Sequence, residues 1–292
     1  MARLLSDDII RKIKEIEIVT RRLLSGSLVG DTRSAQKGVG FEFDQLREYQ
    51  QGDDVRCIDW RASARMNKLL VKQYIEERRR TILVAVDVSY SSFFSSSDLL
   101  AQDAFAHIAS VLALVAEYGK DQVGLLLFSD TIEQYIPPAA GKFHVRKIME
   151  TVFTCEPKSK KTKIAIALEH MAKLKRKDAI LFVLSDFIDS GFDRQLALTS
   201  TMYDLIAIRY LDKNVKTLPA AGFLTIEDIE TGEMNTIDVS KKSSSPVNHF
   251  LHTRLTEQND LFKKYGVSVI DIAPDRHFIG DIIRFFRRRM SY

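Results

Sequence analysis

The feature that most constrains the fold is a set of short, almost continuous apolar runs that begins at residue 81. Aliphatic and β-branched residues fill the runs TILVAVDV (81–88), QVGLLLF (122–128), AILFVLS (179–185), DLIAIRY (204–210) and VSVIDI (267–272). Strands of a parallel sheet have this composition when helices cover both faces, because neither face then meets water. The runs therefore predict a mostly parallel sheet.

Helical patterns separate these runs, at 99–117, at 163–176 and, after a break at Pro246, at 250–264. The alternation predicts an open α/β sheet with helices on both faces. Residues 131–136 follow the second run after almost no linker, so we expect an antiparallel edge strand there. A further β-hairpin is expected at 222–239, turning at Thr231 and Gly232, within an insertion at about 217–240.

The chain before residue 81 has a different pattern. Apolar residues at helical spacing behind Ser6 as N-cap predict an amphipathic helix over 6–24: Ile9, Ile13, Ile16 and Leu23. The segment 25–40, rich in Gly, Ser and Thr, predicts a loop. Alternation of Leu69, Val71 and Ile75 predicts a half-buried strand. We therefore expect an N-terminal region, 1–80, and a larger domain, 81–292.

Composition narrows the class of protein. A hydrophobic content of 45% over 292 residues is enough for a globular core, and no apolar run is long enough for a signal peptide or a membrane span. The two cysteines, Cys57 and Cys155, suggest neither a zinc cage nor a disulfide framework. A soluble, cytoplasmic protein is expected. The net charge of +4 is small. Basic residues cluster at 78–80, 158–163, 173–177 and 287–289, but no aromatic residues are interleaved with them in an RNA-binding pattern, so we do not expect nucleic-acid binding.

Polar residues with possible chemistry stand where the predicted strands end. Asp87 stands near the end of the first run, Ser89 and Ser91 follow that run, and Asp186 follows the third. Thr162 directly precedes a helical pattern. Because ligands bind at the carboxyl ends of strands in open α/β sheets, these side chains are expected to converge. A phosphoryl-transfer aspartate, a nucleophilic serine, a divalent-metal site and a polar turn are all compatible with this pattern.

Several enzyme classes fit the residues poorly. A haloacid-dehalogenase-type phosphatase needs a second carboxylate two residues after its nucleophile, where Ser89 stands. The chain has no Gly-x-Ser-x-Gly elbow, no Walker A loop and no Gly-x-Gly-x-x-Gly fingerprint. A metal-dependent hydrolase stays open as the alternative. Hydroxyl and carboxylate oxygens are hard ligands that suit Mg²⁺ or Mn²⁺.

The series Asp-x-Ser-x-Ser, a distant Thr and a distant Asp resembles the metal-ion-dependent adhesion site (MIDAS) of von Willebrand factor A-like domains, over about 81–292. The resemblance implies that fold, with Ser89, Ser91 and Thr162 bound to Mg²⁺ or Mn²⁺. It implies that Asp87 and Asp186 act directly or through water. One metal position would be left for an acidic side chain of a partner.

A second resemblance lies in LREYQQGDDVRCIDWRASAR, residues 46–65. It resembles the signature of the bacterial von Willebrand factor A-like family named "domain of unknown function 58", on these residues: Arg47, Tyr49, Gly52, Asp53, Asp54, Arg56, Asp59 and Trp60, with Arg65 just beyond. The resemblance implies a non-enzymatic partner of a MoxR-type AAA+ ATPase. Such a protein would act in the assembly or maturation of an unidentified client complex.

The physical role of this block has two interpretations. Its arginines and aspartates could form a salt-bridge lattice, with Trp60 and Tyr49 as apolar anchors, that clamps the N-terminal region onto the sheet. Gly52 before Asp53 suits a tight turn in such a structure. Alternatively, the block is a surface on which a partner docks.

Overall fold

The computed structural model describes residues 7–27, 37–38, 42–75, 80–89, 101–159, 161–176, 179–211, 223–227, 234–238, 246–272 and 282. The chain forms two compact units. The larger unit contains 1–26 and 80–292, and the smaller contains 27–79. The second division between the units falls at residues 79 and 80, and the N-terminal helix belongs to the larger unit.

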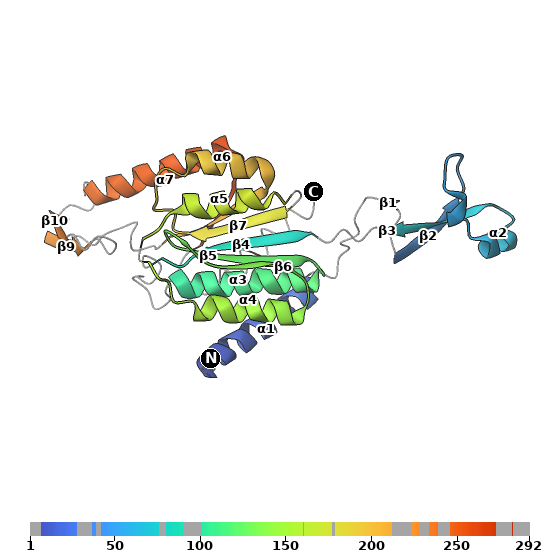
Figure 1. The fold of residues 1–292 in the computed structure, drawn as a ribbon, viewed down its shortest axis with the longest axis horizontal. Helices are drawn as coiled ribbons and strands as arrows, with labels where there is room; N and C mark the ends of the chain where they lie inside the picture. Colours follow the sequence, from blue (N-terminus) through green and yellow to red (C-terminus); the bar gives the residue numbers. More distant parts are fainter. Residues whose placement is uncertain are drawn as a thin grey trace. The chain divides into compact units, whose positions relative to one another are not determined.

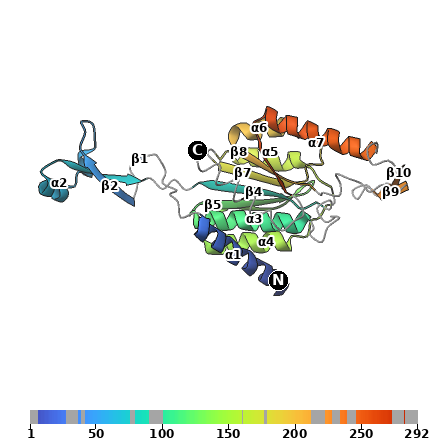
Figure 2. The same cartoon turned by 180° about the vertical axis from the view of Figure 1, so that it is seen from behind.

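The larger unit is built on a six-stranded sheet in the order β11-β8-β7-β4-β5-β6 (Figures 1 and 2). Its strands are β4 (Thr81–Asp87), β5 (Gln122–Phe128), β6 (Ile132–Ala139), β7 (Ala179–Ser185), β8 (Asp204–Tyr210) and β11 (Ser268–Ile272). All neighbours pair in parallel except β5 and β6, which form an antiparallel hairpin at the edge. The predicted parallel sheet and its antiparallel edge strand are confirmed.

Helices cover both faces of this sheet (Figure 1). Two separate cores show which helix lies on which face: α1 (Asp7–Ser27), α3 (Ala101–Tyr118) and α4 (Lys142–Thr154) pack on one, and α5 (Ile164–Leu174), α6 (Asp193–Met202) and α7 (Pro246–Lys264) on the other. Along β4, Val84 and Val86 enter the first core, whereas Leu83 and Ala85 enter the second. Burial on both faces explains why the strand sequences are apolar at nearly every position.

The three predicted helices correspond to α3, α5 and α7, and α7 begins at Pro246 itself. Proline suits the first turn of a helix, because backbone N–H groups there have no acceptor within the helix and proline has no N–H to leave unpaired. Helix α1 confirms the N-terminal prediction, and its Ile13 and Ile16 are buried in the first core. Ser6, its predicted N-cap, lies outside the described residues.

The predicted insertion contains the antiparallel pair β9 (Phe223–Glu227) and β10 (Met234–Asp238). Its turn at Thr231 and Gly232 lies outside the described residues. Both cysteines are free thiols. Among the helices of the described residues, none has the length and apolarity needed to cross a membrane.

The smaller unit contains an antiparallel sheet in the order β1-β3-β2. Its elements are β1 (Lys37–Gly38), β2 (Glu42–Glu48), the 3-10 helix η1 (Val55–Cys57), α2 (Trp60–Met66) and β3 (Leu70–Ile75). Strand β3 confirms the predicted strand, but the predicted alternation is wrong: Leu69 is 49% exposed, and the consecutive Leu70 and Val71 are buried. The loop predicted for 25–40 contains β1, which pairs with β3.

The larger unit also buries a charged side chain, Arg209 on β8, which is 2% exposed. Its guanidinium donates to both oxygens of Asp271 on β11, at 2.8 and 3.2 Å. It also donates to Gln258 Oε1 at 2.8 Å and Asn259 Oδ1 at 3.0 Å, both on α7. A buried guanidinium needs such partners because desolvation is costly. Arg209 therefore ties α7 to the edge of the sheet.

Candidate functional site

Strand β4 lies between β5 and β7, and the chain crosses from one side of it to the other after β6. This is the switch point of the sheet, where ligands of open α/β folds bind at the carboxyl ends of the strands. Asp87, the last residue of β4, pairs in register with Phe128, the last residue of β5. The ends of β4, β5 and β7 therefore meet at one edge, as predicted.

Asp87 is fully buried at this edge. Its Oδ1 accepts from the Ser89 amide at 3.0 Å, and its Oδ2 accepts from Ser185 Oγ at 2.8 Å. Burial, and after it the negative charge of Asp186, raise the pKa of Asp87, and hydrogen bonds from Ser89 and Ser185 offset part of the rise, so that the pKa is about 7. The negative charges of Asp87 and Asp186 thus repel each other in a region that water solvates poorly.

Thr162 reaches the same place from a distant segment. Its Oγ1 donates to Ser89 Oγ at 2.7 Å. The segment is held on both sides, because the Lys163 amide donates to Ser129 O at 3.1 Å and the Ile164 amide donates to Asp189 Oδ2 at 2.7 Å. These bonds attach the start of α5 to the end of β5 and to the loop after β7.

Four of the five predicted residues, Asp87, Ser89, Thr162 and Asp186, therefore come together at the switch point. Asp186 is partly buried, its Oδ1 accepts from the Ile188 amide at 2.9 Å, and its charge acts on Asp87. The fifth residue, Ser91, lies outside the described residues.

The donor set fits a hard cation such as Mg²⁺. Two carboxylates that repel each other in a buried region favour a positive charge between them, and hydroxyl oxygens of Ser89 and Thr162 lie alongside. Within the described ranges, no three His, Cys, Asp or Glu side chains gather as a metal cage. A metal at this edge would therefore depend on hydroxyl groups and water, which suits Mg²⁺.

Sequence reasoning missed the residues that hold this edge in place. Ser185 Oγ donates to Asp87 and accepts from the Phe187 amide at 3.0 Å. Phe187 has a positive φ of 57°, which few non-glycine residues adopt, and its carbonyl accepts from Gln258 Nε2 at 2.6 Å. Gln258 in turn accepts from Arg209. Ser185, a serine at the end of an apolar strand, is the one member of this set with a recognisable sequence signal. The contacts of Phe187 and Gln258 depend on tertiary structure and have no such signal.

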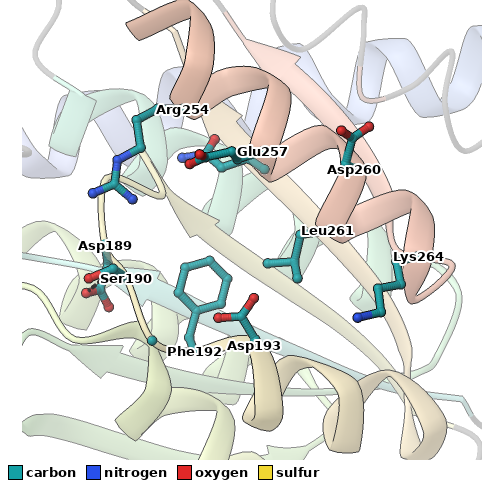
Figure 3. A pocket seen from close by; sticks show the side chains of 11 residues that line it. Asp189, Ser190, Phe192, Asp193, Arg254, Glu257, Asp260, Leu261 and Lys264 are labelled. Atoms are coloured by element: carbon teal, nitrogen blue, oxygen red, sulfur yellow. Dashed lines mark hydrogen bonds between the residues drawn. The ribbon is translucent and has the colours of Figure 1, made fainter. Parts of the chain in front are cut away.

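A pocket of about 480 Å³ lies between α7 and the end of the loop that follows β7 (Figure 3). Phe192 and Leu261 contribute apolar side chains to it, and Arg254 extends from α7 toward Asp189 and Ser190. None of the four predicted metal residues that the structure describes lines this pocket. Asp189 connects the two regions, because it lines the pocket and also caps α5 beside Thr162.

The block at 46–65 is a series of local contacts. Arg47 forms a bidentate pair with Asp53 at 2.6 and 2.7 Å, and this pair, with a hydrogen bond from the Gln50 amide, lowers the pKa of the Asp53 carboxyl to about 2. Asp54 accepts from the Arg56 amide, and Asp59 accepts from the Arg61 and Ala62 amides, so these aspartates cap η1 and α2.

Among the described residues, the salt-bridge lattice of the first interpretation therefore does not extend beyond Arg47 and Asp53. The Arg56 side chain is 93% exposed, with one weak contact to Asp54 at 4.0 Å. Trp60 is 62% exposed, so it is no apolar anchor within its unit, and Tyr49 is half-buried. Gly52 confirms the tight turn, since its φ of 111° favours glycine.

Two solved structures align with most of this chain. BatB from Bacteroides thetaiotaomicron aligns over 73% of this chain and 98% of its own, with 12% identity and a TM-score of 0.48. The von Willebrand factor A domain of SpRpn10 aligns over 70% of this chain and 94% of its own, with 9% identity and a TM-score of 0.38.

Two sequence relatives of this chain come from mycobacteria. The uncharacterized protein Rv1480 of Mycobacterium tuberculosis (strain ATCC 25618 / H37Rv) is 24% identical over 280 residues, which cover 95% of this chain and 88% of the relative. The uncharacterized protein MAV169 of Mycobacterium avium is 24% identical over 162 residues, or 53% of this chain and 93% of the relative. A family match over residues 45–250 begins within the Arg and Asp block and continues through the sheet, so the chain belongs to the family described as "Protein of unknown function DUF58".

Proposed function

We propose that this chain is a non-enzymatic adaptor, working in the cytoplasm, that binds an acidic side chain of a partner protein through a divalent cation. Asp87, Ser89, Ser91, Thr162 and Asp186 would hold the cation, Mg²⁺ or Mn²⁺. When bound, the cation would supply a coordination position for a carboxylate of the partner.

The convergence of Asp87 and Asp186 beside two hydroxyl groups carries the proposal. The free chain holds these carboxylates together at an energetic cost, which the raised pKa of Asp87 reports. A cation would remove that cost. Lys161 and Lys163 flank Thr162, but their side chains are exposed, so water and salt weaken their repulsion of a cation.

The partner we propose is a MoxR-type AAA+ ATPase, with an unidentified client complex that the ATPase assembles or matures. Binding through one shared carboxylate is reversible and depends on the cation, which suits an adaptor. The site residues of this chain would position the partner's carboxylate, and ATP hydrolysis by the ATPase would drive remodelling of the client.

Capture of the ATPase is expected to require the cation. Purified MoxR-type ATPase from the same genome should bind the immobilised chain in Mg²⁺ and should be released by EDTA. The variant Asp87→Asn should fail to bind in Mg²⁺. If this variant in Mg²⁺, or the wild type in EDTA, bound the ATPase as tightly as the wild type does in Mg²⁺, the cation-mediated contact would be overturned. Hydrolysis of phosphoesters with Mg²⁺ would instead support a metal-dependent hydrolase.

Thr162→Ala is expected to weaken Mg²⁺ binding about tenfold, as loss of a hydroxyl at or beside a metal typically does. Its hydroxyl contacts Ser89 at 2.7 Å. Thr162→Ser keeps the hydroxyl and should bind nearly as wild type. Titration of each protein with Mg²⁺ in a calorimeter would measure the difference. An alanine variant with unchanged affinity would remove Thr162 from the proposed site.

A further inference from the structure

We infer that the exposed face of α2 is a second docking surface, which binds an acidic protein surface that has an apolar pocket for an indole ring. The α2 face is defined here as Trp60, Arg61, Ala64 and Arg65. We assign it to the same partner protein as the proposed cation contact, so this part of the inference rests on the proposed function.

Aspartates of the 46–65 block stabilise the structure around the α2 face. Asp59 caps α2 by accepting from the Arg61 and Ala62 amides, and Asp53 is locked by Arg47. On the inner side of the helix, Ser63 is buried and its Oγ accepts from the Leu70 amide at 2.9 Å. The helix therefore has a fixed inner side and presents its other side outward.

The outward residues share one side of the helix. Trp60 and Ala64 are one turn apart, as are Arg61 and Arg65, and all four are exposed. Arg61 and Arg65 have no ion pair with any residue that the structure describes. Two like charges one turn apart destabilise a helix by about 0.2–0.5 kcal/mol. Acidic groups of a partner would pair with Arg61 and Arg65 and offset this repulsion.

In the described part of the smaller unit, more large apolar side chains are exposed than are buried. Within its described part, the buried apolar side chains are Ile58, Leu70 and Val71. Its exposed large apolar side chains are Leu46, Val55, Trp60, Met66 and Leu69, with 39–67% of their surface accessible. Exposed Trp, Met and Arg are typical of protein interfaces, where Trp and Arg contribute most of the binding energy. We therefore favour a protein over a nucleic acid.

Trp60 makes the test direct, because it is the only tryptophan in the chain. Its fluorescence should be readily quenched by acrylamide in the free protein and protected after addition of the purified MoxR-type ATPase. Protection already present in the free protein would overturn the inference, because the same chain or a second copy would then cover the face. Protection by duplex DNA or RNA, without protection by the ATPase, would also overturn it in favour of nucleic-acid binding.

Variants separate this surface from the proposed cation site. Trp60→Ala and the pair Arg61→Glu with Arg65→Glu should each weaken ATPase binding at least tenfold, while thermal stabilisation by Mg²⁺ alone stays unchanged. Tyr118→Ala, at a side chain that is 56% exposed on α3, and the pair Lys142→Glu with Lys147→Glu on α4 are the matched controls and should bind normally. Far-ultraviolet circular dichroism would establish that every variant is folded.

The two proposals fail in different ways. If EDTA and Asp87→Asn leave binding intact but Trp60→Ala reduces it, the cation contact is wrong and the α2 face stands. If Trp60→Ala and the arginine pair bind as tightly as the controls, the α2 face is not a docking surface, whatever Mg²⁺ does.

Discussion

Asp87→Asn is expected to abolish the stabilisation of this chain by Mg²⁺ and to make the metal-free protein more stable at pH 8. At a Mg²⁺ concentration a hundred times its dissociation constant, the wild type should gain about 2.7 kcal/mol in free energy of unfolding. The variant should gain almost nothing, because it lacks a buried negative oxygen. Urea unfolding followed by circular dichroism, with Mg²⁺ or with EDTA, would measure both values.

The gain of the metal-free variant follows from removal of charge. Asp87 is fully buried and faces the charge of Asp186, whereas an asparagine has the same shape and no charge. We expect an increase of about 1–3 kcal/mol at pH 8, since one unit of pKa shift corresponds to about 1.36 kcal/mol and asparagine matches the existing hydrogen bonds imperfectly. Ser185→Ala is a suitable contrast, because it removes a hydrogen bond to Asp87 but leaves the charge. Loss of stability in Asp87→Asn at pH 8 would contradict this account of the site.

The effect of Asp87 should depend on pH in a defined direction. Its pKa is raised in the folded chain from 3.8 to about 7. Between these values the folded state keeps a proton that the unfolded state has lost, so the contribution of Asp87 to stability falls as pH rises from 4 to 7 and is constant above. The stability difference between Asp87→Asn and wild type, measured in EDTA, should therefore grow from pH 5 to pH 7.5. A flat difference would show that Asp87 is ionised throughout.

The second large effect is expected at Arg209. Arg209→Leu should lower the free energy of unfolding by about 3 kcal/mol, because it leaves Gln258 buried without its guanidinium partner and leaves Asp271 and Asn259 without theirs. Asp271 is half exposed, and water replaces part of its lost interaction. Urea unfolding followed by far-ultraviolet circular dichroism is the suitable measurement, since Trp60 belongs to the other unit and does not report on this one.

Arg194→Leu provides the control for this measurement. Arg194 is exposed on α6, so its loss should change the free energy of unfolding by less than about 0.5 kcal/mol. If Arg209→Leu were as mild as this control, the hydrogen bonds of Arg209 would contribute little to holding α7 on the sheet.

The sequence by itself determined the sheet and the edge at which the site lies. Strands covered on both faces must be apolar at nearly every position, so β4, β5, β7 and β8 can be identified directly. Parallel strands place their carboxyl ends together, so the convergence of Asp87 and Asp186 followed from their positions in the chain. Thr162 could be added because a hydroxyl before a helix lies near the same edge.

Only the tertiary structure decided how the remaining residues are used. The arginines and aspartates of the block have the same charges in a lattice and in a set of helix caps, so only the folded chain shows that Trp60 faces outward. Arg209 stands within an apolar run, and its partners lie about 50 and 62 residues away in sequence. Contacts between such distant segments leave no local pattern, because they depend on how elements pack and not on the propensity of any one element.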